Sequence, residues 1–257
     1  MKTVTLKREL IHAGNLIVVN AQHPYQSGGV QRTLVPANPE ANNVLLEDYV
    51  VKILSCVMSK LNGWSQIVAV SGWRPIQEQE EIYAQSLKEN GKDFTEKYVA
   101  LPGCSEHHTG LAIDLGLKQE KIDFIRPEFP YEGICQEFRQ TALSYGFIER
   151  YPRDKEGITG ISHEPWHFRY VGAPHAEIME KYGFALEEYI SFLKDHPYGI
   201  APYLHGTKDM CISVSYLAAD KTADTGFVIE DNVPYSVSGN NMDGFIITEW
   251  RQRDGGQ

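Results

Sequence analysis

The chain has 257 residues, 42% of them hydrophobic and 23% charged, and its formal net charge is −10. This composition is typical of a globular protein with one main core and room for a small addition. The acidic balance, without a cluster of Lys and Arg, argues against nucleic acid and anionic membranes as partners.

We expect a cytoplasmic protein without a membrane anchor. No apolar run is long enough to span a bilayer, and residues 1–20 lack the basic-then-apolar layout of a secretion signal. The four cysteines are far apart and form no C-x-x-C pair, so we predict free thiols: Cys56, Cys104, Cys135 and Cys211. No protein partner is predicted.

The first half of the chain alternates predicted helices and strands. Residues 40–62 place apolar side chains on one helical stripe that ends at Gly63, which predicts a core helix. Residues 66–72 form a short apolar run, and Pro75 suits the first turn of a helix that we predict up to residue 90. Arg74 is therefore expected at a strand-to-helix junction.

The next segments complete a mixed fold. After a loop over 101–110 we predict a strand at 111–117, a helix at 135–146, strands at 147–151 and 165–171, and helices over 175–195. Because the helices are not regularly inserted between the strands, this order predicts an α+β fold rather than a doubly wound sheet.

Short alternating strands and turn clusters fill residues 208–251, without helical periodicity. We therefore predict a main domain over residues 1–200 and a small β-rich C-terminal appendage over 201–257.

The stretch His163-Glu164-Pro165-Trp166-His167 matches the H-E-x-x-H pattern of helical zinc proteases. That chemistry requires both histidines on one face of a helix. Pro165 disfavours helical conformation at Glu164, and the aromatic, β-branched residues that follow predict a strand. We therefore expect Glu164 and His167 to keep their roles, while His163 is not a ligand.

The other segment rich in metal-binding side chains is SEHHTGLAID, residues 105–114. With His167, His107 and Asp114 supply two imidazoles and one carboxylate, and three such ligands with an open fourth position are typical of catalytic zinc. Glu164 would then accept a proton from the attacking water. From the residues alone, a surface or core role for these groups is equally open. His108 is expected in a packing or solvent role.

Three segments carry a resemblance to a known family. SEHHTGLAID fits Ser-x-His-x-x-Gly-x-Ala-x-Asp, EPWH fits Glu-x-x-His, and SGWRPIQEQEEIY resembles the arginine-bearing segment of the zinc D,D-peptidases associated with vancomycin resistance (VanY/VanX type). The likeness spans roughly residues 66–172 and is similar in type to the bifunctional D,D-dipeptidase/D,D-carboxypeptidases.

The resemblance implies an α+β fold whose central antiparallel sheet carries a Zn²⁺ site. It implies that His107, Asp114 and His167 are the zinc ligands, that Glu164 is the catalytic base, and that Arg74 is the cation beside the reacting carbonyl. It also places Ser105 and Trp166 at the substrate site, although Trp166 could be plain core and Arg74 a surface ion-pair residue. On the helix after Arg74, Gln79 and Tyr83 face either the pocket or solvent, and we predict that Gln79 binds substrate.

The predicted reaction is zinc-dependent hydrolysis of the D-Ala-D-Ala bond in the free dipeptide, of the C-terminal D-Ala of the muramyl-pentapeptide precursor, or of both. Two alternatives are a zinc peptidoglycan L,D-endopeptidase and a non-hydrolytic zinc-containing binding module of the same fold. The presence of both Glu164 and Arg74 speaks against the binding module, because a purely structural zinc needs neither.

Overall fold

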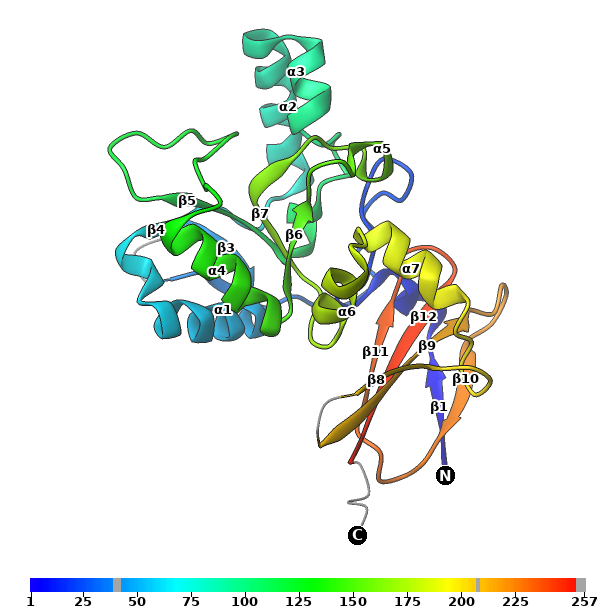
Figure 1. The fold of residues 1–257 in the computed structure, drawn as a ribbon. Coiled ribbons are helices and arrows are strands. Elements are labelled where there is room, and N and C mark those ends of the chain that lie inside the picture. Colours follow the sequence, from blue (N-terminus) through cyan, green and yellow to red (C-terminus); the bar gives the residue numbers. More distant parts are fainter. Residues whose placement is uncertain (39–42, 207–208, 253–257) are drawn as a thin grey trace. The chain divides into compact units, whose positions relative to one another are not determined.

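The computed structural model describes residues 1–38, 43–206 and 209–252 (Figure 1). The chain forms two compact units. The central unit contains Val19–Tyr25 and Gln31–Ala185, and the terminal unit contains Met1–Val18, Gln26–Val30 and the chain from Leu186 onward. The division into domains at residue 200 stays a prediction.

The central unit is built on a four-stranded antiparallel sheet of order β4-β5-β7-β6. The sequence predicted each of these strands, and the α+β fold with a central antiparallel sheet is confirmed. The strands are β4 (Ile67–Ser71), β5 (Ala112–Leu117), β6 (Phe147–Tyr151) and β7 (Glu164–Tyr170).

Helices α1 (Asp48–Leu61) and α4 (Gly133–Ser144) cover one face of this sheet and enclose the main core with it (Figure 1). Ile113 and Leu115 of β5 and Phe168 of β7 are buried in that core. Because side chains alternate along a strand, the residues between them point to the opposite face. That second face carries the candidate site.

The predicted helix over residues 40–62 is wrong in its first part. Helix α1 begins at Asp48, and Leu45–Glu47 instead forms strand β3, which pairs with β2 (Leu34–Pro36). Leu46 is fully buried in this strand, and its apolar side chain also fits the spacing of the predicted helical stripe. Residues 39–42 lie outside the described part of the chain.

The remaining elements of the central unit surround the sheet. Helix α2 (Ile76–Asn90) confirms the predicted helix after Arg74, and it lies beside α3 (Lys92–Tyr98) (Figure 1). The others are the 3₁₀ helices η2 (Gly63–Ser65) and η3 (Glu106–Thr109), and helices α5 (Glu156–Thr159) and α6 (His175–Tyr182).

The terminal unit is mostly antiparallel sheet. One sheet has the order β11-β12-β9-β8, and β1 from the N-terminal end pairs with β10. Its elements are β1 (Lys2–Leu6), η1 (Arg8–His12), α7 (Leu186–Lys194), β8 (Tyr203–Gly206), β9 (Met210–Ala218), β10 (Thr225–Ile229), β11 (Tyr235–Gly239) and β12 (Gly244–Gln252). None of the helices in the described residues is both long and apolar enough to cross a membrane.

Candidate active site

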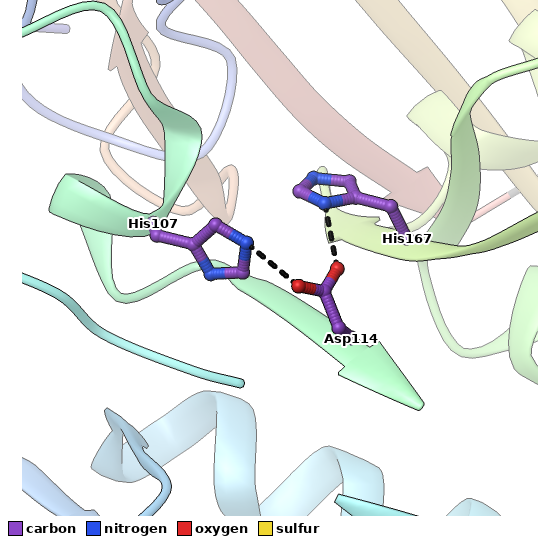
Figure 2. A group of neighbouring side chains, drawn as sticks. All are labelled: His107, Asp114 and His167. Atoms are coloured by element: carbon purple, nitrogen blue, oxygen red, sulfur yellow. Dashed lines mark hydrogen bonds and ion pairs between the residues drawn. The ribbon is translucent and has the colours of Figure 1, made fainter. Parts of the chain in front are cut away.

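Three potential metal ligands meet on the second face of the central sheet. One ligand atom each from His107, Asp114 and His167 lies within 4.8 Å of the others, and all three side chains are buried. His107 Nε2 is 3.1 Å from Asp114 Oδ2, and His167 Nδ1 is 2.9 Å from Asp114 Oδ1 (Figure 2). The carboxylate therefore faces one nitrogen of each imidazole.

Strand pairing accounts for two of these positions. Asp114 on β5 lies directly opposite His167 on β7, so both side chains leave the sheet on the same face. His107 comes from η3, and its own N–H donates to the Ser105 hydroxyl that caps the start of this helix. Gly110, with φ +68°, turns the chain from η3 into β5, a conformation that suits glycine.

Glu164 reaches the same face through an irregularity between β6 and β7. Glu149 of β6 pairs with Phe168 of β7, and Tyr151 of β6 pairs with Glu164 of β7. The two pairs are two residues apart on β6 but four residues apart on β7. In a regular strand, Glu164 and His167 would point to opposite faces of the sheet because they are three residues apart. A β-bulge changes the direction of the side chains beside it, and proline is tolerated at a bulge. Glu164 Oε2 consequently lies 3.7 Å from His167 Nδ1. The prediction that this motif is not helical is confirmed.

Arg74 occupies the predicted junction between β4 and α2. Its Nη1 donates to Gln79 Oε1 at 2.7 Å and its Nη2 donates to Ser71 Oγ at 2.6 Å, which fixes the guanidinium plane. The same junction orients a potential metal ligand, because His107 Nδ1 donates to the carbonyl of Gly72 at 2.7 Å. With Nδ1 occupied, Nε2 of His107 is the nitrogen free for a metal.

All predicted site residues line one cavity that is open to solvent. Ser105 and Trp166 are buried in its wall, and Trp166 also belongs to the main core. Gln79 also lines the cavity, but both polar atoms of its amide already have hydrogen-bond partners. Its Oε1 accepts from Arg74, and its Nε2 donates to the carbonyl of Ala100. The residues predicted as catalytic, metal-binding or substrate-binding are Arg74, Gln79, Ser105, His107, Asp114, Glu164, Trp166 and His167.

Burial and nearby charges shift the ionisation of these groups. Burial alone would lower the pKa of His167, but Asp114, Glu106 and Glu164 outweigh it and raise the pKa to about 9. Burial, opposed only in part by Asp114, leaves the pKa of His107 below its usual value. Burial also raises the pKa of Glu164 well above its usual value, with Asp114 adding to the effect and His167 opposing it.

Several other polar residues make their contacts away from the three potential metal ligands. His163 Nε2 contacts Tyr131 Oη at 2.6 Å and Glu149 Oε1 at 3.3 Å. His108 Nδ1 donates to the carbonyl of Arg74 at 2.8 Å, and its ring packs against Tyr25. Tyr83 and Cys104 line a neighbouring pocket instead.

The sequence reasoning missed a buried ionic cluster behind His167. Glu106 Oε1 accepts from Arg150 Nε at 2.8 Å and from Arg169 Nη1 at 2.7 Å, and these side chains are almost fully inaccessible to solvent. Two arginines inside apolar strands, in FIERY and WHFRYV, are the signal that could have revealed it, because a buried arginine requires a partner.

Comparison with known proteins assigns this chain to a family. Residues 51–173 match the VanY model, described as D-alanyl-D-alanine carboxypeptidase. The bifunctional D-Ala-D-Ala dipeptidase and D-Ala-D-Ala carboxypeptidase VanXYC of Enterococcus gallinarum is 44% identical over 179 residues, which make up 69% of this chain and 94% of that protein. The chain belongs to the VanY family.

Solved structures of VanY-type enzymes agree with this assignment. The vancomycin-resistance D,D-dipeptidase VanXYg, in complex with a D-Ala-D-Ala phosphinate analog, is 51% identical with a TM-score of 0.93, over 97% of this chain and 99% of that one. A mutant of the D,D-pentapeptidase VanY from a VanB-type cassette, in complex with Zn(II), is 29% identical with a TM-score of 0.58, over 68% of this chain and 98% of that one. The predicted resemblance, and with it the prediction of a carboxypeptidase/dipeptidase-type hydrolase, is confirmed.

Proposed function

We propose that this VanY-family chain is a zinc-dependent D,D-peptidase that cleaves the D-Ala-D-Ala bond. The observation that carries the proposal is the convergence of three metal-competent atoms, a buried carboxylic acid and a fixed guanidinium on one cavity. A binding module would need no base, and a structural metal site would have four protein ligands and no cavity beside it.

The donor set fits a catalytic zinc. His107 Nε2, Asp114 and His167 Nδ1 are nitrogen and oxygen donors of the kind zinc prefers, and they leave a position open to the cavity. When bound there, zinc would act as a Lewis acid toward a carbonyl and make water acidic enough to attack near neutral pH. The zinc complex of the VanY relative supports this choice of metal.

Glu164 is the residue we assign to proton transfer. It lies in the cavity wall next to a proposed ligand, yet the three donors form a complete catalytic set without it. A divalent cation beside it would favour its ionised form, which can take a proton from the attacking water. Glu164 would then return that proton to the amine of the departing D-alanine.

Arg74 supplies a fixed positive charge in the wall of the same cavity. Its guanidinium is held by Gln79 and Ser71, so it does not need to reorganise when negative charge develops on the carbonyl oxygen. We therefore propose that Gln79 positions Arg74. For Ser105 and Trp166, both in the cavity wall, contact with the substrate remains a prediction.

The substrates we propose are the free D-Ala-D-Ala dipeptide and the D-Ala-terminated muramyl-pentapeptide precursor, in support of vancomycin resistance. The bifunctional name of the Enterococcus gallinarum relative supports both activities, and the phosphinate complex of VanXYg supports the dipeptide. The cytoplasmic location expected from the sequence stays a prediction.

Product analysis with three substrates, namely D-Ala-D-Ala, the pentapeptide precursor and an L-Ala-D-Glu-containing peptide, tests the proposal. The zinc-loaded protein should hydrolyse D-Ala-D-Ala, the pentapeptide precursor or both, and should lose this activity on chelation and regain it with zinc. Cleavage of L-Ala-D-Glu-containing peptides alone would instead identify an L,D-endopeptidase. Zinc binding without any hydrolysis would identify a binding module.

A further inference from the structure

A buried carboxylate lies directly behind the proposed ligand His167. Glu106 is 1% exposed, and its Oε2 is 3.6 Å from His167 Nε2. Among the residues that the structure describes, neither of these two atoms has a hydrogen-bond partner. Buried polar atoms are rarely left unpaired, so the two facing atoms call for an explanation.

The orientation of the His167 ring gives the explanation. Its Nδ1 is the nitrogen turned toward Asp114 and the other donor atoms, as Figure 2 shows. A neutral imidazole that presents Nδ1 to a cation carries its only proton on Nε2. That N–H points at Glu106, and a small shift of the ring would close the 3.6 Å separation to a hydrogen bond.

Glu106 is fixed for this task by its other oxygen. Oε1 accepts from both Arg150 and Arg169, at 2.8 and 2.7 Å, so the carboxylate cannot turn away and Oε2 stays directed at His167. The second proposed imidazole ligand has a different partner, because His107 Nδ1 donates to the neutral carbonyl of Gly72. A carboxylate is the stronger acceptor of the two.

We propose that Glu106 is a positioning residue that accepts the Nε2–H hydrogen bond of His167 and so directs Nδ1 of that ring to the metal. The inference rests on the metal site of the proposed function. A carboxylate behind a ligand imidazole fixes its orientation and makes it a better donor to the metal.

The variant that tests the proposal is Glu106→Gln, which keeps the shape of the side chain and removes its charge. Zinc affinity, measured by competition with a chromophoric chelator, should fall by about 10- to 100-fold. The matched control is Glu149→Gln, because Glu149 also accepts from a guanidinium (Arg139 Nε, 2.9 Å) and faces an imidazole (His163), but away from the metal group. Its zinc affinity should stay unchanged, and equal affinities in both variants would overturn the proposal.

Glu106 neutralises two buried arginines, so the Glu106→Gln variant could fail to fold. A second measurement therefore tests the proposal on the unmodified protein. NMR of the protein with isotope-labelled histidine, titrated with zinc, should show His167 bound through Nδ1 and an Nε2–H proton protected from solvent exchange. Binding through Nε2, or a freely exchanging Nε2–H, would overturn the role of Glu106 and leave the proposed function standing. Absence of zinc binding at His107 and His167 would instead overturn the metal site itself.

Discussion

Glu164 differs from the other two carboxylates of the site in its surroundings. Two imidazoles contact Asp114 and two guanidinium groups contact Glu106, and these partners hold the pKa of each carboxyl below its usual range against the effect of burial. Burial dominates at Glu164 and raises its pKa. The site thus combines two permanently ionised carboxylates with one that can gain and lose a proton, as a general base must.

Replacing Glu164 should separate proton transfer from metal binding. In Glu164→Gln the three proposed ligands are intact, so we expect about one zinc per chain. The rate constant kcat should fall by about 10²- to 10⁴-fold, because the amide cannot accept the proton of the attacking water. Zinc content and D-Ala-D-Ala hydrolysis measured on the same preparation check this, and near-normal turnover would remove Glu164 from the mechanism.

Arg74 is expected to act on the transition state more than on the bound substrate. If its guanidinium faces the developing oxyanion, Arg74→Ala should lower kcat and kcat/KM together by about a hundredfold or more, with KM little changed. Arg74→Lys should recover only part of this loss, because a flexible ammonium group does not reproduce the planar guanidinium that Gln79 and Ser71 hold in place. Steady-state kinetics on D-Ala-D-Ala decide. A raised KM with unchanged kcat would show instead that Arg74 binds the substrate carboxylate.

The ionisation of His167 predicts how zinc affinity depends on pH. Its pKa is raised to about 9 in the metal-free protein, so below that pH the ring is cationic and must lose its Nδ1 proton to bind zinc. His107 has a lowered pKa and is already neutral near pH 7. The association constant should therefore rise at least about tenfold per pH unit below pH 9, and the contribution of His167 should level off above that pH. Calorimetry near neutral pH in buffers of different ionisation enthalpy should detect at least about one released proton per zinc, with a second where zinc also ionises Glu164, and no released proton would contradict the assignment.

At the scale of elements, local patterns predicted the strands and helices that carry the site. The apolar segment after the loop at 101–110 predicted a strand that contains Asp114, and Pro165 argued against a helical metal motif. The face on which Glu164 lies could not be predicted, because the bulge is set by the pairing of β7 with β6. Strand β3 was missed for a related reason, since its apolar residues continue the helical stripe of α1 and only its pairing with β2 shows otherwise.

The ionic cluster of Glu106, Arg150 and Arg169 could not be predicted from local patterns either. Its members come from η3, β6 and β7, and the contact exists only after these three elements assemble. The ligand segments were easier to predict because their donors are unusual in a loop-strand pair, and the family resemblance supplied their roles.

The junction between β4 and α2 depends on a close approach of two backbones. A Cβ on Gly72 would collide with the carbonyl oxygen of Leu45, which also accepts from the Trp73 N–H at 2.6 Å. Gly72→Ala should therefore push β3 from the junction, lower the free energy of unfolding by about 1–3 kcal/mol and weaken zinc binding through His107. Thermal unfolding and zinc titration measure both effects. Gly157→Ala is the control, because nothing lies within 4 Å of that Cβ, and equal effects in the two variants would contradict the argument.

For the whole molecule, relatives of this family match either nearly all of this chain, as VanXYg does over 97% of it, or only part of it. The match to the bifunctional relative covers 94% of that protein but only 69% of this chain. The match to the zinc-bound VanY structure covers 98% of that protein but only 68% of this chain. All proposed ligands and catalytic residues lie in the central unit. The chemistry is therefore expected to depend on the central unit.

The terminal unit offers a direct test of this expectation through its own core. Phe227 on β10 is buried with Leu6 of β1, whereas the next residue, Val228, is 53% exposed. Phe227→Ala should destabilise the terminal unit by about 3–5 kcal/mol, and the control Val228→Ala should have little effect. Hydrogen exchange of β9 and β12 amides should report the loosening. Zinc affinity and D-Ala-D-Ala hydrolysis, measured below the unfolding transition, should match the unmodified protein, because the variant changes no residue of the central unit. A parallel loss of zinc affinity in Phe227→Ala, but not in Val228→Ala, would show that the site requires an intact terminal unit.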